Sequence, residues 1–191
     1  MDERRDFIEV LIQDHREAEQ IFDEIERLSA EGFGTGTLGM ARELTDQVIT
    51  ELIKHSVAEE EYLYPRVRKE LPNGDEIAEM EIMEHAQAEE TMKQLDGMSP
   101  SNLDYLTTVR KLAGQIREHA GKEEADLFPA LGGVLDQEER LKLGAQIEKA
   151  KAMAPTHPHP SAPDRPPMNK VLGPGVALID RVRDVLTGRK H

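Results

Sequence analysis

Four of the seven histidines in this chain are each followed, four positions later, by a glutamate. The pairs are His15 with Glu19, His55 with Glu59, His85 with Glu89 and His119 with Glu123. Residues four apart are neighbours on one face of an α-helix, so both side chains of a pair can reach one metal ion or two adjacent ions. Because 38 of the 191 residues are acidic, chance would produce all four pairs in on the order of one case in 600. The pattern therefore indicates a metal site built from histidine and carboxylate.

A lone histidine on an apolar helix face is commonly a core residue, and a histidine–glutamate pair is commonly a surface ion pair. Each of these four histidines also follows an apolar residue by three positions, as expected on a core-facing stripe; the four are Ile12, Leu52, Ile82 and Ile116. Burying imidazoles and carboxylates without partners would cost several kcal/mol. Bound cations would remove that cost, which favours the metal interpretation. The remaining histidines, His157, His159 and His191, are expected to be exposed in a linker or at the terminus.

The residue types narrow the choice of metal. The chain has no cysteine, which excludes disulfides and thiolate ligation. Nitrogen and oxygen ligands suit Fe, Mn or Zn, and six to eight donors are too many for one tetrahedral zinc. Carboxylates that face each other across a helical bundle suit bridging between two ions. The ferritin-type Glu-x-x-His pair is absent, since Ile or Leu stands three positions before each of the four histidines.

Apolar residues at alternating spacings of three and four predict the helices that position these side chains. The expected helices cover residues 3–30, 40–70, 75–97, 102–128 and 136–152. The glycine-rich stretch 31–39 should separate the first two, and Pro65 should kink the second or end its regular part. Residues 71–74 read as a turn. Ser99 or Ser101 is expected to cap the fourth helix, which should stop at Pro129 and the following glycines.

Four long helices joined by short connections predict an all-α fold, an up-down-up-down four-helix bundle over residues 1–152 with a short extra helix. A Pro-rich linker follows at 153–169. Residues 170–191 read as a short amphipathic C-terminal helix, and the alternatives are that it docks on the bundle, binds a protein partner, mediates self-association or stays loose. Residues 1–150 carry a net charge of −18 and residues 151–191 of +4.

Charge and composition also exclude classes of partner. The acidic body would repel phosphate, so we expect no nucleic-acid partner. No apolar run is long enough for a membrane span, and the start of the chain lacks a signal-peptide pattern, so a cytoplasmic protein without a membrane partner is expected.

The second and fourth helices carry the same motif, H-x3-E-E-x2-L-aromatic-P, at residues 55–65 and 119–129. The first and third match more weakly, through an acidic residue before the histidine and Ala-Glu after it. The chain therefore looks like a duplicated helix pair, and packing the two pairs together would bring four histidines to one level of the core.

In this order of histidines and glutamates, residues 5–130 resemble the hemerythrin-like (HHE cation-binding) family. The resemblance implies two non-haem iron ions joined by an oxo or hydroxo group and by carboxylates. It implies His15 and His55 on one iron and His85 and His119 on the other. Glu59 and Glu123 would then bridge the two ions.

Oxygen-carrying hemerythrins have a histidine where this chain has Glu89, a departure that argues against a carrier. Glu89 is a candidate ligand in its place, and Glu19 is a ligand or a partner of one. The resemblance implies a small ligand: O2, H2O2 or NO. Two functions stay open, an enzyme that decomposes hydrogen peroxide and a non-catalytic sensor or binding module for iron, oxygen or NO. Glu89 and Tyr62 favour the enzyme, because anionic ligands stabilise higher oxidation states; Tyr62 also suits core packing.

Overall fold

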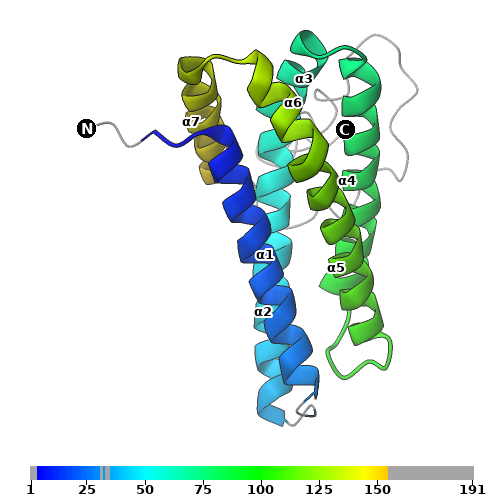
Figure 1. The fold of residues 1–191 in the computed structure, drawn as a ribbon. Helices are drawn as coiled ribbons and strands as arrows, with labels where there is room; N and C mark the ends of the chain where they lie inside the picture. Colours follow the sequence, from blue (N-terminus) through cyan, green and yellow to red (C-terminus); the bar gives the residue numbers. More distant parts are fainter. Residues whose placement is uncertain (1–3, 31, 33–34, 155–191) are drawn as a thin grey trace, which may run out of the picture.

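The computed structural model describes residues 4–30, 32 and 35–154, and these form helices joined by short turns (Figure 1). In chain order the elements are α1 (Phe7–Ala30), α2 (Thr35–Ala58), η1 (Glu59–Leu63), α3 (Tyr64–Glu70), α4 (Gly74–Asp96), α5 (Tyr105–Lys122), η2 (Glu123–Leu127), α6 (Phe128–Val134) and α7 (Gln137–Met153). The described part contains no strand, so the all-helical fold predicted from the apolar spacing is confirmed.

The four long helices α1, α2, α4 and α5 run alternately up and down (Figure 1). α1 packs on α2 and α4 on α5, while contacts between α1 and α5 and between α2 and α4 close the ring. α3 and α6 continue α2 and α5 at one end, and α7 lies against α1 and α2. The predicted four-helix bundle with a shorter fifth helix is therefore present.

Two apolar clusters fill the bundle, one on each side of a polar layer. The first lies toward the end where α1 and α2 join and includes Phe22, Leu95 and Tyr105. The second lies toward the end that carries α3 and α6 and includes Phe7 and Leu131. His15, His85 and His119 lie in the sequence segments between the two clusters, and His55 lies at the edge of the first cluster, so apolar residues border the polar layer on both sides.

Both H-x3-E-E segments form a wide, π-helical turn. In η1 the N–H of Tyr64 donates to the carbonyl of Glu59, and in η2 the N–H of Phe128 donates to the carbonyl of Glu123, each five residues back. Each turn is followed by a proline, which has no N–H for a regular helical bond and whose ring would crowd the preceding carbonyls. The wide turn accommodates the proline, and such turns are frequent at functional sites.

Three expected boundaries were wrong. α2 begins at Thr35, so two of the glycines assigned to the connection lie inside the helix. The fourth helix starts at Tyr105, without a side-chain cap, and Ser99 and Ser101 instead contact each other in the preceding turn. After η2 the helix continues past Pro129 to Val134, because proline is tolerated in the first turn of a helix.

The predicted turn at 71–74 is confirmed, with Asn73 in the left-handed conformation (φ 58°). Gly74 is required there, because a Cβ would lie 2.1 Å from the carbonyl oxygen of Val67. A similar close approach packs α7 on the start of the chain, since a Cβ on Gly144 would lie 2.2 Å from the carbonyl oxygen of Arg5. α7 begins with a capping box formed by Asp136 and Glu139.

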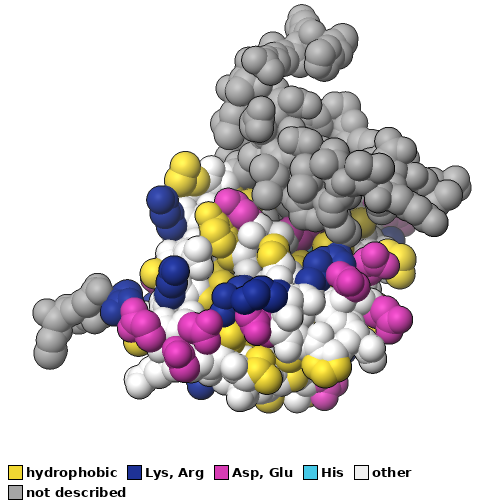
Figure 2. All heavy atoms as spheres, turned by 90° about the horizontal axis from the view of Figure 1, so that it is seen from above, with side chains coloured by type: hydrophobic (Ala, Val, Ile, Leu, Met, Phe, Trp, Pro, Cys, Tyr) yellow, Lys and Arg dark blue, Asp and Glu magenta, His cyan; other side chains and the backbone are white. Residues whose placement is uncertain are grey.

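At the end of the bundle that carries α3 and α6, acidic and basic side chains of the described residues are intermingled (Figure 2). No helix in the described ranges is long and apolar enough to cross a membrane. The predicted linker beyond residue 154 and the predicted helix at 170–191 lie outside the described residues.

Candidate metal centre

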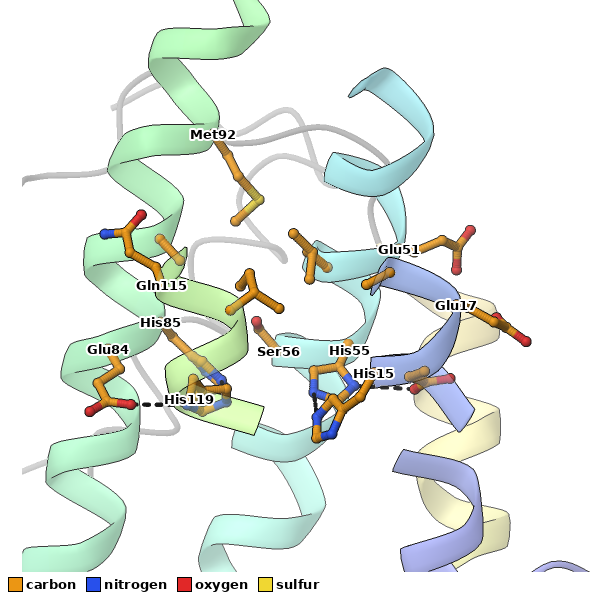
Figure 3. Close-up of a pocket in the computed structure, with 15 residues that line it drawn as sticks. His15, Glu17, Glu51, His55, Ser56, Glu84, His85, Met92, Gln115 and His119 are labelled. Carbon is orange, nitrogen blue, oxygen red and sulfur yellow. Dashed lines mark hydrogen bonds and ion pairs between the residues drawn. The ribbon is translucent and has the colours of Figure 1, made fainter. Parts of the chain in front are cut away.

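The bundle brings the four helix-borne histidines into two facing pairs, one from each half of the chain (Figure 3). The first pair is His15 and His55, whose Nε2 atoms lie 3.3 Å apart. The second pair is His85 and His119, with Nε2 atoms 3.2 Å apart. All four side chains are buried. Two imidazole lone pairs at that distance repel each other unless a proton or a metal ion lies between or beside them.

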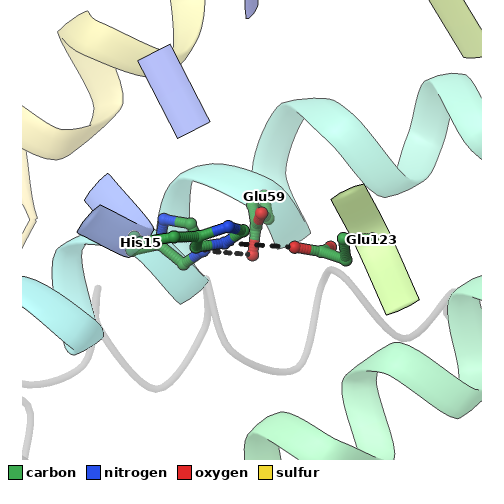
Figure 4. A group of neighbouring side chains, drawn as sticks. His15, Glu59 and Glu123 are labelled. Carbon is green, nitrogen blue, oxygen red and sulfur yellow. Dashed lines mark hydrogen bonds and ion pairs between the residues drawn. The ribbon is translucent and has the colours of Figure 1, made fainter. Parts of the chain in front are cut away.

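Glu59 and Glu123 each reach one histidine of both pairs. Oε2 of Glu59 lies 3.2 Å from Nε2 of His55 and 3.3 Å from Nε2 of His85. Oε2 of Glu123 lies 3.5 Å from Nε2 of His15 and 3.5 Å from Nε2 of His119. Figure 4 shows both carboxylates turned toward His15 and toward each other. This is the placement that a carboxylate bridging two metal ions needs.

The cluster contains buried carboxylate oxygens that no hydrogen-bond donor satisfies. Both glutamates are 0% exposed, yet Oε1 of Glu59 and Oε2 of Glu123 have no hydrogen-bond partner. Such buried oxygens are costly unless a cation binds them. Neighbouring side chains form groups that could hold an ion. One group consists of His15, His55, Glu59 and Glu123, and another of Glu59, His85 and His119. The residues present therefore fit a cation centre.

Proton binding shows the same demand for positive charge. Burial would lower the pKa of His55, but the carboxylates of Glu59 and Asp14 outweigh it and raise the pKa to about 10. Burial would raise the pKa of Glu59, but His55 and His85 bring it well below its usual range. Burial, reinforced by the charge of Glu59, raises the pKa of Glu123. The cluster thus attracts protons where ions would otherwise neutralise it.

Every one of the four histidines has a carboxylate at its outer nitrogen, Nδ1. The distances from Nδ1 to the nearest carboxylate oxygen of each partner are 3.0 Å for His15 and Glu124, 3.2 Å for His55 and Asp14, 3.1 Å for His85 and Glu60, and 3.2 Å for His119 and Glu84. Nδ1–H donates to the carboxylate, which leaves the Nε2 lone pair directed at the cluster. Carboxylates in this position fix the ring and increase its basicity as a ligand.

These outer contacts follow the duplication of the chain. Asp14 and Glu84, which precede the histidines of α1 and α4, hold the histidine of the next helix in the same half. The second glutamate of each Glu-Glu motif crosses to the other half: Glu60 reaches His85, and Glu124 reaches His15. Sequence reasoning missed all four, although the repeated motifs at 55–65 and 119–129 contain two of them.

Tyr64 is a further residue that the sequence did not single out. Its hydroxyl lies 3.1 Å from Nε2 of His85, 3.4 Å from Oε2 of Glu59 and 3.3 Å from Oε1 of Glu123. Its counterpart in the other half is Phe128, whose ring stacks on His15 at a centroid distance of 5.9 Å. Comparing the two motifs residue by residue, rather than as "aromatic", would have shown that only one half carries a hydroxyl.

Three other candidates lie elsewhere. The structure does not bring Glu89 to the cluster: its carboxylate lies 3.5 Å from Nζ of Lys93. Glu19 pairs with Arg117 at 2.8 Å. Tyr62 packs against the apolar cluster near α3, and the neighbouring Glu61 raises the pKa of its phenol. Of the seven residues expected as ligands, six come together: His15, His55, Glu59, His85, His119 and Glu123.

A small cavity of about 20 Å³ borders the two histidine pairs. The apolar part of its wall includes Leu52, Ala88, Met92 and Ile116, and polar residues such as Ser56 and Gln115 also line it. Met92 points down into the space between the pairs (Figure 3). A cavity of this size has room for about one water-sized molecule.

Comparison with known proteins agrees with this geometry. Residues 6–131 match the family model described as the hemerythrin HHE cation-binding domain. An uncharacterised hemerythrin-like protein of Schizosaccharomyces pombe is 32% identical over 179 residues, which cover 93% of this chain and 85% of that protein. A DNA nickase of Nostoc is 28% identical over 144 residues, 75% of this chain but only 38% of that protein's length. No solved structure gives a significant match. With a family match over most of its length and a buried His/Glu cluster to support it, the chain belongs to the hemerythrin HHE cation-binding family.

Proposed function

We propose that this protein holds two iron ions, one at each histidine pair, and uses them to decompose hydrogen peroxide. The observation that carries the two-ion centre is the position of Glu59 and Glu123. Each carboxylate has an oxygen within 3.5 Å of one histidine in the first pair and one histidine in the second pair. A site for one ion would need its carboxylates at a single histidine pair, whereas Glu59 and Glu123 both lie between the two pairs.

The ions, when bound, would supply redox equivalents and open positions for a small ligand. The protein's own contribution is the environment. The four outer carboxylates hold the imidazoles in the ligating tautomer, and their negative charge favours the higher oxidation states that peroxide chemistry requires. Tyr64 places its phenolic oxygen within 3.4 Å of a carboxylate oxygen of both Glu59 and Glu123. In disproportionation two H2O2 give two H2O and one O2, so protons must move between oxygen atoms, and Tyr64 is placed to donate or accept one.

The second candidate is a non-catalytic sensor or binding module for O2, NO or iron. The observation that favours it is the apolar part of the wall of the cavity beside the histidines. O2 and NO can occupy an apolar cavity without hydrogen-bond partners, whereas hydrogen peroxide has donors and acceptors that need partners there. Both candidates need the same pair of ions, and they differ in whether the ligand turns over.

One experiment separates the two candidates. The purified protein is analysed for iron and for an oxo-bridge absorption in the near ultraviolet, and released O2 is followed after peroxide is added. About two irons per chain with sustained O2 release that Glu123→Ala abolishes supports the enzyme. Two irons with a stable spectral change and no turnover supports the sensor. A chain that binds no iron, or a single zinc ion, contradicts both.

A further inference from the structure

The two histidine pairs differ in the charge that surrounds them. At the first pair, each outer carboxylate is matched by a cation. Glu124, at His15, pairs with Arg16 at 2.8 Å, and Asp14, at His55, pairs with Lys151. The outer charges around the first pair therefore cancel.

At the second pair, three carboxylates surround the outer nitrogens and only one has a cation. Glu84 pairs with Lys122 at 2.6 Å. Glu60 lies against Nδ1 of His85, and a third carboxylate, Glu81, lies 3.1 Å from Nδ1 of His119. Within the described ranges neither Glu60 nor Glu81 forms an ion pair with Lys or Arg, and both are buried. Two outer negative charges are left over.

The duplication explains where the difference comes from. Glu81 lies four residues before His85, and the matching position before His15 is Leu11, a core residue. Among the residues that the structure describes, no Lys or Arg pairs with Glu60 or Glu81 as Arg16 and Lys151 pair with the outer carboxylates of the first pair. The two halves thus share their ligands but not their outer charges.

We propose that the two metal positions are inequivalent, and that the pair His85–His119 binds its ion more tightly and is filled first. The inference rests on the proposed two-ion centre. Buried negative charge attracts a cation strongly because few water molecules screen it. Both positions offer two imidazoles and a share of Glu59 and Glu123. The hydroxyl of Tyr64 lies at the second pair only, but it is uncharged. The outer carboxylates are therefore the difference in charge that decides the order of filling.

Two binding steps alone would not test this, since the first ion repels the second in any two-ion site. A matched pair of variants does, because Glu60→Gln and Glu124→Gln each remove one outer charge, at the second and first pair respectively. Glutamine oxygen still accepts a hydrogen bond from Nδ1, so the ring stays held. Metal-free wild type and variants are titrated with Co(II) by calorimetry, after circular dichroism has confirmed helical folding.

If the second pair fills first, Glu60→Gln raises the dissociation constant of the first step, by about 10–100-fold. Glu124→Gln leaves the first step unchanged and weakens the second. If the positions were equivalent, the first ion would choose the unaltered position in either variant, so both variants would weaken only the second step. That result, or the reverse assignment of the two variants, overturns the proposal.

Glu81→Gln provides an independent arm, with Glu79→Gln, an exposed glutamate on the same helix, as its control. The proposal requires that Glu81→Gln weakens the first step and that Glu79→Gln does not. An unchanged first step in Glu81→Gln contradicts it. Wild-type protein that binds fewer than two Co(II) ions would instead remove the two-ion centre itself. If wild-type protein binds two Co(II) ions but the variants do not change the binding steps as expected, the two-ion centre stands and only the inequivalence of its positions is contradicted.

Discussion

Lys151 of α7 forms an ion pair with Asp14 of α1, 137 residues away in the chain, and Asp14 in turn accepts from His55. Both members of the ion pair are mostly buried, with side chains 20% and 11% exposed. The last helix is therefore tied through one carboxylate to the metal centre. The contact gives α7 a role beyond covering α1 and α2.

Replacing Lys151 with Met should destabilise the metal-free protein by about 1–2 kcal/mol, because the partly buried Asp14 loses a charge partner. Denaturant unfolding followed by circular dichroism measures the change. Lys149→Met, at an exposed position on the same helix, should change stability by less than about 0.5 kcal/mol. Equal losses in the two variants would show that the ion pair contributes nothing specific.

Glu59→Gln and Glu89→Gln should differ in metal content. Glu59 lies between the histidine pairs, so the amide should lose a bridging carboxylate and retain fewer than two irons per chain. Glu89 pairs with Lys93 outside the cluster, so its amide variant should retain both. Iron quantification on the purified variants decides the matter. Loss of an ion from Glu89→Gln would restore the ligand role that its spacing from His85 suggested.

Tyr64→Phe should destabilise the metal-free protein by about 1.5–3 kcal/mol, since the buried hydroxyl donates to charged carboxylates. The loss should be smaller once metal is bound, because the ions then satisfy Glu59 and Glu123. Thermal unfolding with and without metal measures both values. Tyr62→Phe is the control and should be nearly neutral. A loss for Tyr64→Phe that is the same in both forms would separate the hydroxyl from the metal ligands.

The metal-free protein should lose stability as the pH rises from about 6.5 to about 10. The pKa of His55 is raised from 6.5 to about 10 in the folded state, and those of His85 and His119 are also raised. A histidine whose pKa is higher in the folded state than in the unfolded state stabilises the folded protein fully when the pH is below the unfolded-state pKa. This contribution is lost as the pH rises through the folded-state pKa. The total should be on the order of a few kcal/mol. Urea unfolding at several pH values measures it, and His55→Gln should flatten the profile; a flat wild-type profile would contradict the electrostatics.

Metal binding should respond to pH in the opposite sense. An ion displaces protons from the imidazoles, so metal affinity should increase over the same pH window.

The bundle and the buried cluster of histidines with Glu59 and Glu123 could be predicted because both depend on spacing along one helix. Apolar residues three and four apart predicted the core-facing stripes, and the His-x3-Glu spacing predicted that His55 and Glu59 share a face. The same spacing was not enough for Glu89. Glu59 and Glu123 each open a π-helical turn, whereas Glu89 sits within the regular helix α4 and turns to Lys93.

Contacts between helices could not be predicted from such spacing. Whether Glu60 reaches His85 depends on how η1 and α4 are rotated and shifted against each other, and no periodicity within either element contains that information. The π-helical turns were also missed, although Pro65 and Pro129 indicated an interruption at the right places. Tyr64 was overlooked because it was grouped with Phe128 as an aromatic residue, which hid the hydroxyl.

The crossing contacts of Glu60 and Glu124 have a consequence for the origin of the protein. Each half of the chain supplies the carboxylate that orients a histidine of the other half, and Glu59 and Glu123 each contact one histidine of each half. A single helix pair therefore lacks part of the cluster. If the chain arose by duplication of one helix pair, that pair would have completed the cluster only as a symmetric dimer, and fusion would leave each half free to change its outer charges independently.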